Sequence, residues 1–433
     1  MSDDALHVDI PNEAGWPPRS VDSLCSLISR GTAPVYVEHS DVLAIGQRCV
    51  ATTGFVAELA RPHSHRAIHN VLCPEPGDVL LNSTGTGTIG RSVVFDALGT
   101  FIVDGHVTVM RPRAEVADSR WLNSVLRTPW LQRHLERFCY SGSTNQLELN
   151  RTPLRESRLP TPHIEEQRRI AQILDTLDTA IHETEAFIAK LKALKQGLLH
   201  DLLTRGIDDN GELRPPQSEA PHLYKESPLG WIPKDWEAKA VREMGEAITG
   251  CTPPSHDPLA WGAGLPFVTP GDIDGDSMVA STERHVSVRG QRYVRVLPSR
   301  TTLVVCIGST IGKVGITSVE ACTNQQINAV LPGEGTDNEF LFHALQMHAN
   351  QLRALAGLQA VPIVNKSSFE SVLVPCPAAR EQVEISRRVL VSSRRLMSEQ
   401  TLSEKLTRQK AGLMDDLLTG RVRVTPLLAA TTA

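Results

Sequence analysis

Several features that would indicate a secreted, membrane or metal-ribbon protein are missing from this sequence of 433 residues. Its eight cysteines lie far apart and form no Cys-x-x-Cys pair, so neither a zinc ribbon nor a disulfide framework is indicated. The N-terminal stretch MSDDALHVDI is neither basic nor apolar, and no apolar run approaches the roughly 18 residues that span a bilayer. We therefore expect a cytoplasmic protein without a signal peptide and without a membrane partner.

A strong excess of charge of one sign is also missing. The formal net charge of −5 argues against a protein that coats nucleic acid without selectivity. It is compatible with a local basic groove on a larger, balanced molecule. The net charge therefore does not decide the partner.

The motifs of familiar catalytic centres are missing too. There is no Gly-x-Ser-x-Gly elbow, and no Asn/Asp-Pro-Pro-aromatic motif of the kind many amino-methyltransferases use. His65, His69 and Cys73 have helical spacing and could form a metal-binding face, but Pro62 and Pro74 confine any helix there. Scattered histidines are the favoured interpretation, and we expect no catalytic residue, no metal and no cofactor.

Two glycine-rich stretches raise the alternative of a nucleotide enzyme. GTGTIGRS (85–92) approaches a phosphate-binding loop but lacks its lysine, and GSTIGKVG (308–315) has the lysine with the wrong glycine spacing. Both run into β-type sequence, whereas a phosphate-binding loop runs into a helix. Tight turns between strands, centred on Gly90 and Gly312 and carrying a basic tip, are favoured; a nucleotide-hydrolysing enzyme using 85–92 stays an alternative.

An internal repeat organises the whole chain. DGHVTVMRP (104–112) precedes NQQINAVLP by 220 residues, and the features from Trp16 to Pro34 return at the same offset. Further along, an offset of 215 pairs Gly142 with Gly357 and GLLHDLLT (197–204) with GLMDDLLT. The chain therefore consists of two similar halves.

Each half is predicted to be a mixed α/β domain of short strands followed by a long helix. The predicted divisions are a first domain 1–160, a first helix 161–205, a linker 206–230, a second domain 231–376, a second helix 377–421 and a tail 422–433.

The two helices carry heptad patterns typical of coiled coils. The seam of the first is Leu174, Leu177, Ile181, Ile188, Leu191, Leu198 and Leu202, and that of the second, which polar residues interrupt, includes Leu396, Leu406, Leu413 and Leu417. A helix of ~40 residues is about 60 Å long, close to two turns of DNA. Such helices could hold two domains apart.

Duplicated polar loops are the best candidates for a binding surface. SGSTNQLELNR (141–151) corresponds to AGLQAVPIVNK (356–366), and in both a Gln precedes an Asn followed by a basic residue. Asn and Gln amides suit adenine edges, and Arg or Lys suits guanine or phosphate; alternatively, the Asn residues cap turns and the basic residues are merely solvated. With the glycine-rich stretches, the predicted DNA-binding residues are Ser83, Thr86, Thr88, Arg91, Ser143, Asn145, Gln146, Arg151, Ser309, Thr310, Lys313, Gln325, Gln326, Gln359 and Lys366.

The chain resembles the specificity subunit of type I restriction-modification systems. The resemblance rests on LPTPHIEEQRRIAQILDTLDTAI (159–181), LGWIPKDWEAKAV (229–241), GDVLLNSTGTGTIGR and TNQQINAVLP. It is specific because Pro-x-Pro-(x)₃-Glu-Gln begins a long helix twice, at 160–167 and 375–382.

This resemblance implies a function without catalysis by the chain itself. In the family, two target recognition domains each read one half of a split, asymmetric double-stranded DNA site, and the two helices form an antiparallel coiled coil with pseudo-twofold symmetry. The coil docks two methyltransferase subunits and, through them, possible restriction subunits, so that the complex methylates adenine and cleaves DNA with ATP. The resemblance adds Glu166, Gln167, Glu381 and Gln382 to the helix residues expected to serve docking or spacing. A structural helical-hairpin adaptor that does not bind DNA stays a second alternative.

Overall fold

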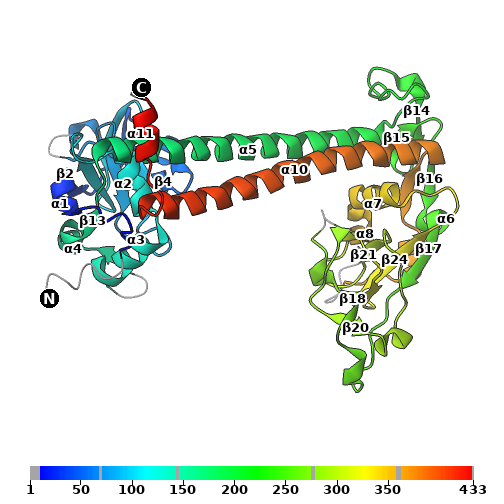
Figure 1. Ribbon diagram of the computed structural model, residues 1–433. Coiled ribbons are helices and arrows are strands. Elements are labelled where there is room, and N and C mark those ends of the chain that lie inside the picture. Colours follow the sequence, from blue (N-terminus) through cyan, green and yellow to red (C-terminus); the bar gives the residue numbers. More distant parts are fainter. Residues whose placement is uncertain (1–9, 68–70, 143–145, 275–277, 357–361, 432–433) are drawn as a thin grey trace. The chain divides into compact units, whose positions relative to one another are not determined.

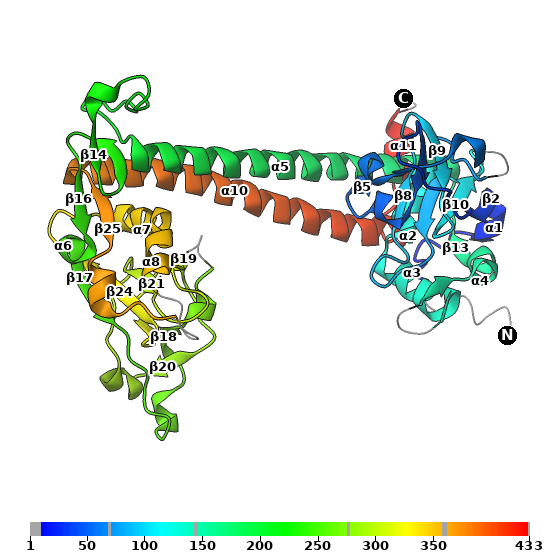
Figure 2. The same ribbon diagram turned by 180° about the vertical axis from the view of Figure 1, so that it is seen from behind.

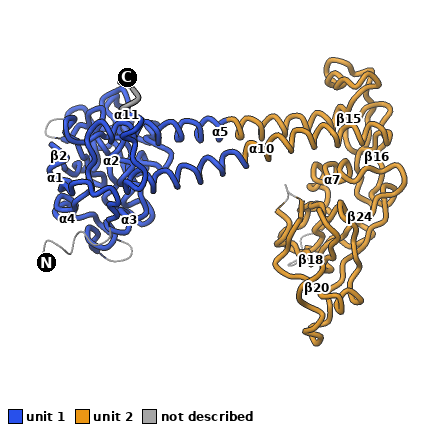
Figure 3. Tube along the Cα trace, in the orientation of Figure 1, with its two compact units in different colours: residues 1–186, 401–433 blue, residues 187–400 orange. Residues whose placement is uncertain are grey.

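The computed structural model describes residues 10–67, 71–142, 146–274, 278–356 and 362–431. The chain forms two compact units, shown in Figure 3. Unit 1 contains residues 1–186 and 401–433, and unit 2 contains residues 187–400. Each unit therefore combines one globular part with a segment of both long helices.

Unit 1 is built around a four-stranded sheet of order β2-β10-β7-β8 and a three-stranded sheet of order β6-β3-β9. Helices α2 and α3 pack into the core with β7 and β10. The strands are β1 (Pro18–Ser20), β2 (Cys25–Arg30), β3 (Val42–Ile45), β4 (Val50–Ala51), β5 (Gly54–Phe55), β6 (Arg61–Pro62), β7 (Val79–Asn82), β8 (Ser92–Val94), β9 (Thr100–Val103), β10 (Val107–Pro112), β11 (Tyr140–Ser141), β12 (Glu148–Leu149) and β13 (Arg158–Pro160). The helices are α1 (Val21–Leu24), α2 (Ser119–Leu126), α3 (Pro129–His134), α4 (Arg151–Glu156) and, after the second long helix, α11 (Thr425–Thr431).

Unit 2 has a five-stranded sheet of order β17-β24-β21-β22-β19 and a three-stranded sheet of order β20-β18-β23. Its strands are β14 (Tyr224–Ser227), β15 (Gly230–Pro233), β16 (Glu237–Ala240), β17 (Gly245–Thr249), β18 (Gly264–Val268), β19 (Met278–Val279), β20 (His285–Ser287), β21 (Thr302–Val305), β22 (Val314–Thr317), β23 (Cys322–Thr323), β24 (Ile327–Pro332) and β25 (Leu373–Cys376). Its helices are α6 (Val241–Met244), α7 (Asn338–Met347), α8 (Ala349–Leu355) and α9 (Lys366–Glu370). Strand β14 lies inside the segment 206–230 that was expected to link the two halves.

The two units repeat one topology. The order β2-β10-β7-β8 corresponds to β17-β24-β21-β22, and β6-β3-β9 corresponds to β20-β18-β23. In both three-stranded sheets the central strand pairs in parallel with one neighbour and antiparallel with the other. The predicted duplicated α/β architecture is confirmed.

The long helices are α5 (Ile164–Thr204) and α10 (Ala379–Leu418), which lie side by side in Figures 1 and 2. The start of α5 and the end of α10 pack into the core of unit 1 through Leu174 and Leu417. The end of α5 and the start of α10 pack into the core of unit 2 through Leu202 and Ile385. The predicted antiparallel helix pair is therefore confirmed, and the predicted seam residues of both helices are buried or half-buried.

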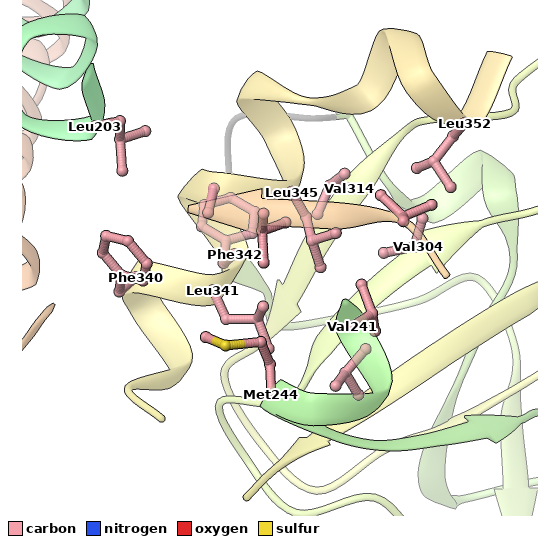
Figure 4. Packing of buried hydrophobic residues seen from close by; sticks show 14 of the residues in the cluster. Leu203, Val241, Met244, Val304, Val314, Phe340, Leu341, Phe342, Leu345 and Leu352 are labelled. Atoms are coloured by element: carbon pink, nitrogen blue, oxygen red, sulfur yellow. The ribbon is translucent and has the colours of Figure 1, made fainter. Parts of the chain in front are cut away.

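The core of unit 2 shows how a long helix joins a sheet. In Figure 4, Leu341 of α7 lies near Met244 of α6, Leu345 lies near Val304 of β21, and Phe340 lies on the side of α7 nearer to Leu203 of α5. Asp337 caps α7 by accepting a hydrogen bond of 2.9 Å from the Phe340 amide, which fixes where the helix begins. Helix α7 therefore lies in the core between the sheet and α5.

A buried glutamine ties each long helix to its α/β domain. In unit 1, Gln167 Oε1 accepts from the Asp118 amide at 2.9 Å, and its Nε2 donates to the Val116 and Pro162 carbonyls at 2.9 Å. In unit 2, Gln382 Oε1 accepts from the Asp337 amide at 3.0 Å, and its Nε2 donates to the Pro377 carbonyl at 2.9 Å. Asp118 and Asp337 cap α2 and α7, so the glutamine fixes one helix against the start of another.

The glutamate before each glutamine forms an ion pair with an arginine that follows the other long helix. Glu166 is held by Arg423 through two hydrogen bonds of 2.7 and 2.9 Å. Glu381 accepts from Arg214 at 2.6 Å, from the Trp236 indole at 3.0 Å and from the Ile207 amide at 2.7 Å. Each ion pair therefore links the start of one long helix to the segment that follows the end of the other.

The Arg214 side chain keeps its positive charge although it is largely buried. Its side chain is 10% exposed and that of Glu381 is 11% exposed. Burial opposes the charge, but the hydrogen bond and the charge of Glu381, with the charge of Asp235, outweigh it and raise the pKa of Arg214. Removing Glu381 would leave a buried, poorly compensated cation.

We therefore expect Glu381→Ala to lower the free energy of unfolding by about 3 kcal/mol, because breaking one side of a buried ion pair has a cost of that size. Urea denaturation followed by circular dichroism measures it. Glu404→Ala, at an exposed position of the same helix, should change the free energy of unfolding by less than about 0.5 kcal/mol. Equal midpoints for the two variants would contradict the structural role of Glu381.

Candidate nucleic-acid interface

The glycine-rich stretch of unit 1 is a turn between the antiparallel strands β7 and β8. Gly90 has φ +83° and its amide donates to the Asn82 carbonyl at 2.9 Å. The Thr88 hydroxyl donates to Gln47 Oε1 at 3.2 Å. Arg91 is exposed and donates to the Gly87 carbonyl at 2.6 Å, so its guanidinium lies over the turn.

The corresponding stretch of unit 2 joins the antiparallel strands β21 and β22. Gly312 has φ +86° and its amide donates to the Val305 carbonyl at 3.0 Å. Lys313 is half-buried and its ammonium donates to the Ile273 carbonyl at 3.0 Å. Because a strand and not a helix follows each turn, the favoured interpretation as strand-to-strand turns is confirmed and the geometry of a phosphate-binding loop is absent from both. Only Arg91 forms the exposed basic tip that was expected.

Three segments that the repeat singled out meet beside each turn. In unit 1 the Ser83 amide donates to the His106 carbonyl at 2.9 Å, and the Leu149 amide donates to the Ser83 carbonyl at 2.8 Å. In unit 2 the Cys306 amide donates to the Gln326 carbonyl at 2.8 Å, and the Val364 amide donates to the Cys306 carbonyl at 2.8 Å. The backbone frame of the candidate interface is therefore the same in both units.

The side chains on this frame are polar and charged in unit 1. A pocket beside the turn is lined by Arg30, Gln47, Arg61, Asp104, His106 and Glu148. Arg30 pairs with Glu148 at 3.2 Å, and Thr84 shares a hydrogen bond of 2.8 Å with His106. Sequence patterns missed Arg30, Gln47 and Arg61, because no repeated motif marks these residues and they lie on strands and loops distant from the turn in the sequence.

The same positions of unit 2 are more apolar. Ile307 bridges Ile363 where Thr84 bridges Glu148 in unit 1, and 46% of Ile363 is exposed. Gln326 takes the place of His106, and the exposed Gln325 accepts a hydrogen bond of 2.6 Å from Thr252. One backbone frame therefore presents two different chemical surfaces.

The structure separates the predicted DNA-binding residues into groups. Thr86, Gln146, Arg151, Ser309 and Lys366 are exposed, while Thr88, Thr310 and Gln326 are half-buried. Ser83, in contrast, is fully buried and hydrogen-bonded to Thr108, so its side chain is not available to DNA. Ser143, Asn145 and Gln359 lie outside the described residues.

The alternative interpretation of the duplicated Asn-basic pair holds for the asparagine of unit 2. Asn365 Oδ1 accepts a hydrogen bond of 2.8 Å from the Ser368 amide and caps α9. The Lys366 ammonium Nζ lies 3.6 Å from Glu370 Oε1 and forms an ion pair with it. Asn150 also stands at the start of a helix, α4, but its side chain makes no capping hydrogen bond. The amide of Asn365 is therefore used within its own unit.

The docking residues expected at the start of each long helix are used internally. The side chains of Glu166, Gln167 and Gln382 are almost completely buried and bonded within their units. Buried side chains cannot touch a partner directly, so these residues hold the helices in place.

The possible metal-binding face at His65, His69 and Cys73 lies only partly within the described residues. No group of three potential metal ligands occurs among the described residues, and His69 lies outside them. Burial raises the pKa of the Cys25 and Cys322 thiols to about 12, so both stay protonated at neutral pH. Within the described part of the chain, no helix is long and apolar enough to cross a membrane.

Comparison with known protein families identifies sequences similar to this chain. The model of the type I restriction modification DNA specificity domain matches residues 67–193 and 233–408. A putative type I restriction enzyme MjaX specificity subunit of Methanocaldococcus jannaschii is 25% identical over 356 residues, covering 80% of this chain and 79% of the relative. The type I restriction enzyme HindI specificity subunit of Haemophilus influenzae is 31% identical over 196 residues, covering 44% of this chain and 41% of the relative.

Solved structures share the fold at low sequence identity. The S subunit of a type I restriction-modification system from M. genitalium aligns with a TM-score of 0.58 and 14% identity, covering 94% of this chain and 98% of that one. A chain from a structural study of complex assembly and conformational transition in a type I R-M system aligns with a TM-score of 0.55 and 16% identity, covering 95% and 99%.

A glycine substitution tests the turn itself. We expect Gly90→Ala to lower the free energy of unfolding by about 1–3 kcal/mol, because the positive φ is strained for alanine and the new methyl would meet Gln132 and Tyr140. Gly87→Ala is the matched control, since Gly87 also has a positive φ but open space around its Cβ position. In chemical denaturation, Gly90→Ala should have a lower free energy of unfolding than Gly87→Ala. The reverse order would refute the close packing behind the turn.

Proposed function

This chain belongs to the family of type I restriction-modification DNA specificity subunits, whose role is DNA recognition, and we propose that it reads a bipartite, asymmetric site in double-stranded DNA. Each unit binds one half-site with its turn and the two segments beside it. Methyltransferase subunits that dock on the long helices then modify adenine. The chain contributes recognition and no catalytic group.

The observation that carries the proposal is the difference between two surfaces built on one frame. The backbone hydrogen bonds beside the turns are equivalent in the two units. The side chains differ, because the positions of Thr84 and Glu148 in unit 1 are occupied by Ile307 and Ile363 in unit 2. Acidic, amide and basic side chains read base edges by hydrogen bonds, while apolar side chains suit the thymine methyl group. Two surfaces of different chemistry favour two different half-sites over one repeated sequence.

Basic residues outside the pockets suit the sugar-phosphate backbone. Arg91 and Arg151 in unit 1 and Lys366 in unit 2 are exposed. Contacts of this kind set the register of a protein on DNA without reading the bases. We assign them positioning roles in each half-site.

The long helices supply the spacer. Each is one continuous helix whose two ends are anchored in two different cores, by Leu174 and Leu202 in α5 and by Ile385 and Leu417 in α10. Their length sets the number of unspecified base pairs between the half-sites. An ion pair between Asp178 and Lys410 links the two helices in unit 1.

The exposed faces of the helices offer a docking surface for the methyltransferase subunits and, through them, for restriction subunits. Val383, Val391 and Met397 of α10 are 55%, 56% and 69% exposed. At 100° per residue they fall within an arc of about 120° on the helix. Exposed apolar side chains on one side of a helix are typical of a surface that a partner covers.

Genome-wide mapping of modified adenines tests the proposal. The full chain is co-expressed with the methyltransferase subunit of its system in cells that lack other adenine methylation. We expect one motif with two specified half-sites around a fixed unspecified gap, and modification should disappear without the chain. Modification without such a motif, or modification independent of the chain, would refute the proposal.

Shortening the spacer should alter the gap and leave the bases unchanged. We choose residues 182–188 of α5 together with 397–403 of α10, which lie opposite in the helix pair, as the contact of Phe187 with Arg395 indicates. Deleting seven residues from each removes about 10 Å, or about three base pairs, and nearly preserves the helix faces.

The same adenine mapping measures the effect. A shorter gap, or loss of modification where the DNA cannot present both half-sites, is the expected result. Altered bases within a half-site would show that the helices do more than set spacing. Replacing the same two segments by heptads of equal length is the control.

A further inference from the structure

A tyrosine and an arginine form a stacked pair in the pocket of unit 1. The Arg61 guanidinium carbon lies 3.6 Å from the centroid of the Tyr36 ring. The Tyr36 hydroxyl donates to Asp104 Oδ2 at 3.1 Å, and the backbone of Tyr36 bridges that of His63. The ring is therefore held from two sides, and it holds the guanidinium in one plane.

A tryptophan and an arginine form the same arrangement in unit 2. The Arg284 guanidinium carbon lies 3.6 Å from the centroid of the Trp261 ring, and both residues line a pocket with His285. The indole packs edge-on against Phe267, with ring centroids 5.0 Å apart, and its backbone bridges Val286. In unit 2 a different aromatic residue, held by different neighbours, therefore also stacks on an arginine guanidinium.

The two arginines occupy equivalent places in the fold. Arg61 pairs with Ala44 of β3, and the Arg284 carbonyl accepts from the Phe267 amide of β18. The residue after Ala44, Ile45, accepts from the Asp104 amide at 3.0 Å; the residue after Phe267, Val268, accepts from the Asn324 amide at 3.1 Å. Because Asp104 and Asn324 correspond in the repeat, the register of the three-stranded sheets superimposes Arg61 on Arg284.

Neither guanidinium donates a hydrogen bond to another described residue. Among the described residues, no hydrogen bond or ion pair joins the side chain of Arg61 or Arg284 to an acceptor, and both are exposed. Other stacked arginines differ in this respect, since Arg423 binds Glu166 and Arg292 binds Asp257. A guanidinium oriented by an aromatic ring but left with free donors is prepared for an external planar acceptor.

We propose that Arg61 and Arg284 are equivalent guanine-reading residues, one for each half-site. This inference rests on the proposed function. A guanidinium donates two parallel hydrogen bonds to O6 and N7 of guanine in the major groove, and this geometry needs the fixed plane that stacking provides. A phosphate can also be bound bidentately by arginine, but it does not require this planar fork, because a lysine ammonium binds phosphate as a point charge.

In unit 1 the arginine lies beside the rest of the candidate interface. One pocket contains Arg61 together with Gln47 and His106, which bond to Thr88 and Thr84 of the turn. If the turn contacts the sugar-phosphate backbone of DNA, Arg61 lies where the neighbouring DNA bases would be. Each half-site accordingly contains a guanine that its arginine specifies.

Arginine substitutions combined with adenine mapping test this inference. Arg61→Ala in the full chain, co-expressed with the methyltransferase subunit, should make one guanine position of one half-site degenerate and leave the other half-site unchanged. The discrimination lost at that position should be roughly 5- to 150-fold, the range for one bidentate contact. Arg284→Ala should do the same in the other half-site.

Two exposed basic residues outside the pockets provide matched controls. Arg19→Ala in unit 1 and Arg242→Ala in unit 2 remove the same charge and should leave both half-sites intact. Half-sites without guanine, or an Arg61→Ala chain whose modification falls equally at all sites, would overturn the inference while the bipartite motif of the wild-type chain stands. A wild-type chain without a bipartite motif would overturn the proposed function and the inference with it.

A measurement on the unaltered protein covers the case in which a variant fails to fold. The wild-type chain with its methyltransferase is bound to duplexes of the mapped motif in which single guanines are replaced by 7-deazaguanine, which lacks the N7 acceptor but still pairs. Binding should fall at least about fivefold at one guanine of each half-site. Unchanged binding at every guanine would overturn the inference.

Discussion

The ion pair that joins the start of one long helix to the segment after the other is the contact on which the rest of the structure depends. Glu166 and Arg423 form it in unit 1, and Glu381 and Arg214 form it in unit 2. A helix of about 60 Å transmits the position of one end to the other only if both ends are fixed. The buried Gln167 and Gln382 complete this fixation by binding the N-termini of α2 and α7.

These ion pairs and glutamine hydrogen bonds explain why the Glu-Gln pair occurs at the start of both helices. The glutamate binds forward, to the chain that leaves the other helix, and the glutamine binds back, to the domain that precedes it. Both side chains are buried, and an uncompensated charge or amide there would be costly. The motif that best identifies the family in this sequence is thus explained by packing and hydrogen bonding within the chain.

Sequence patterns predicted the features that backbone geometry demands. The turn glycines Gly90 and Gly312 have positive φ, which few other residues adopt without strain, and they recur in both halves. The seam leucines recur because the antiparallel helices must bury one face. The duplicated fold and the two long helices could therefore be predicted from spacing, whereas the antiparallel pairing of the helices was implied by the family resemblance.

The surfaces that differ between the units could not be predicted in the same way. The burial of Ser83 follows from its place beside Thr108 on β10, and the capping by Asn365 follows from where α9 begins. Arg61 and Arg284 are 223 residues apart, as are Ser83 and Cys306 beside the turns, but the residues around them differ and the stacking rings Tyr36 and Trp261 are 225 residues apart. The strand register establishes their equivalence, which no shared sequence motif marks.

A shared backbone frame that carries different side chains gives one fold two chemically different surfaces. Backbone hydrogen bonds position the turn, the central strand and the loop after α3 or α8 without using any side chain. Side chains such as Glu148 and Ile363 can then differ completely without disturbing the joints at Glu166 and Glu381. The side chains of the candidate surfaces and the side chains that fix the ends of the long helices are therefore different residues.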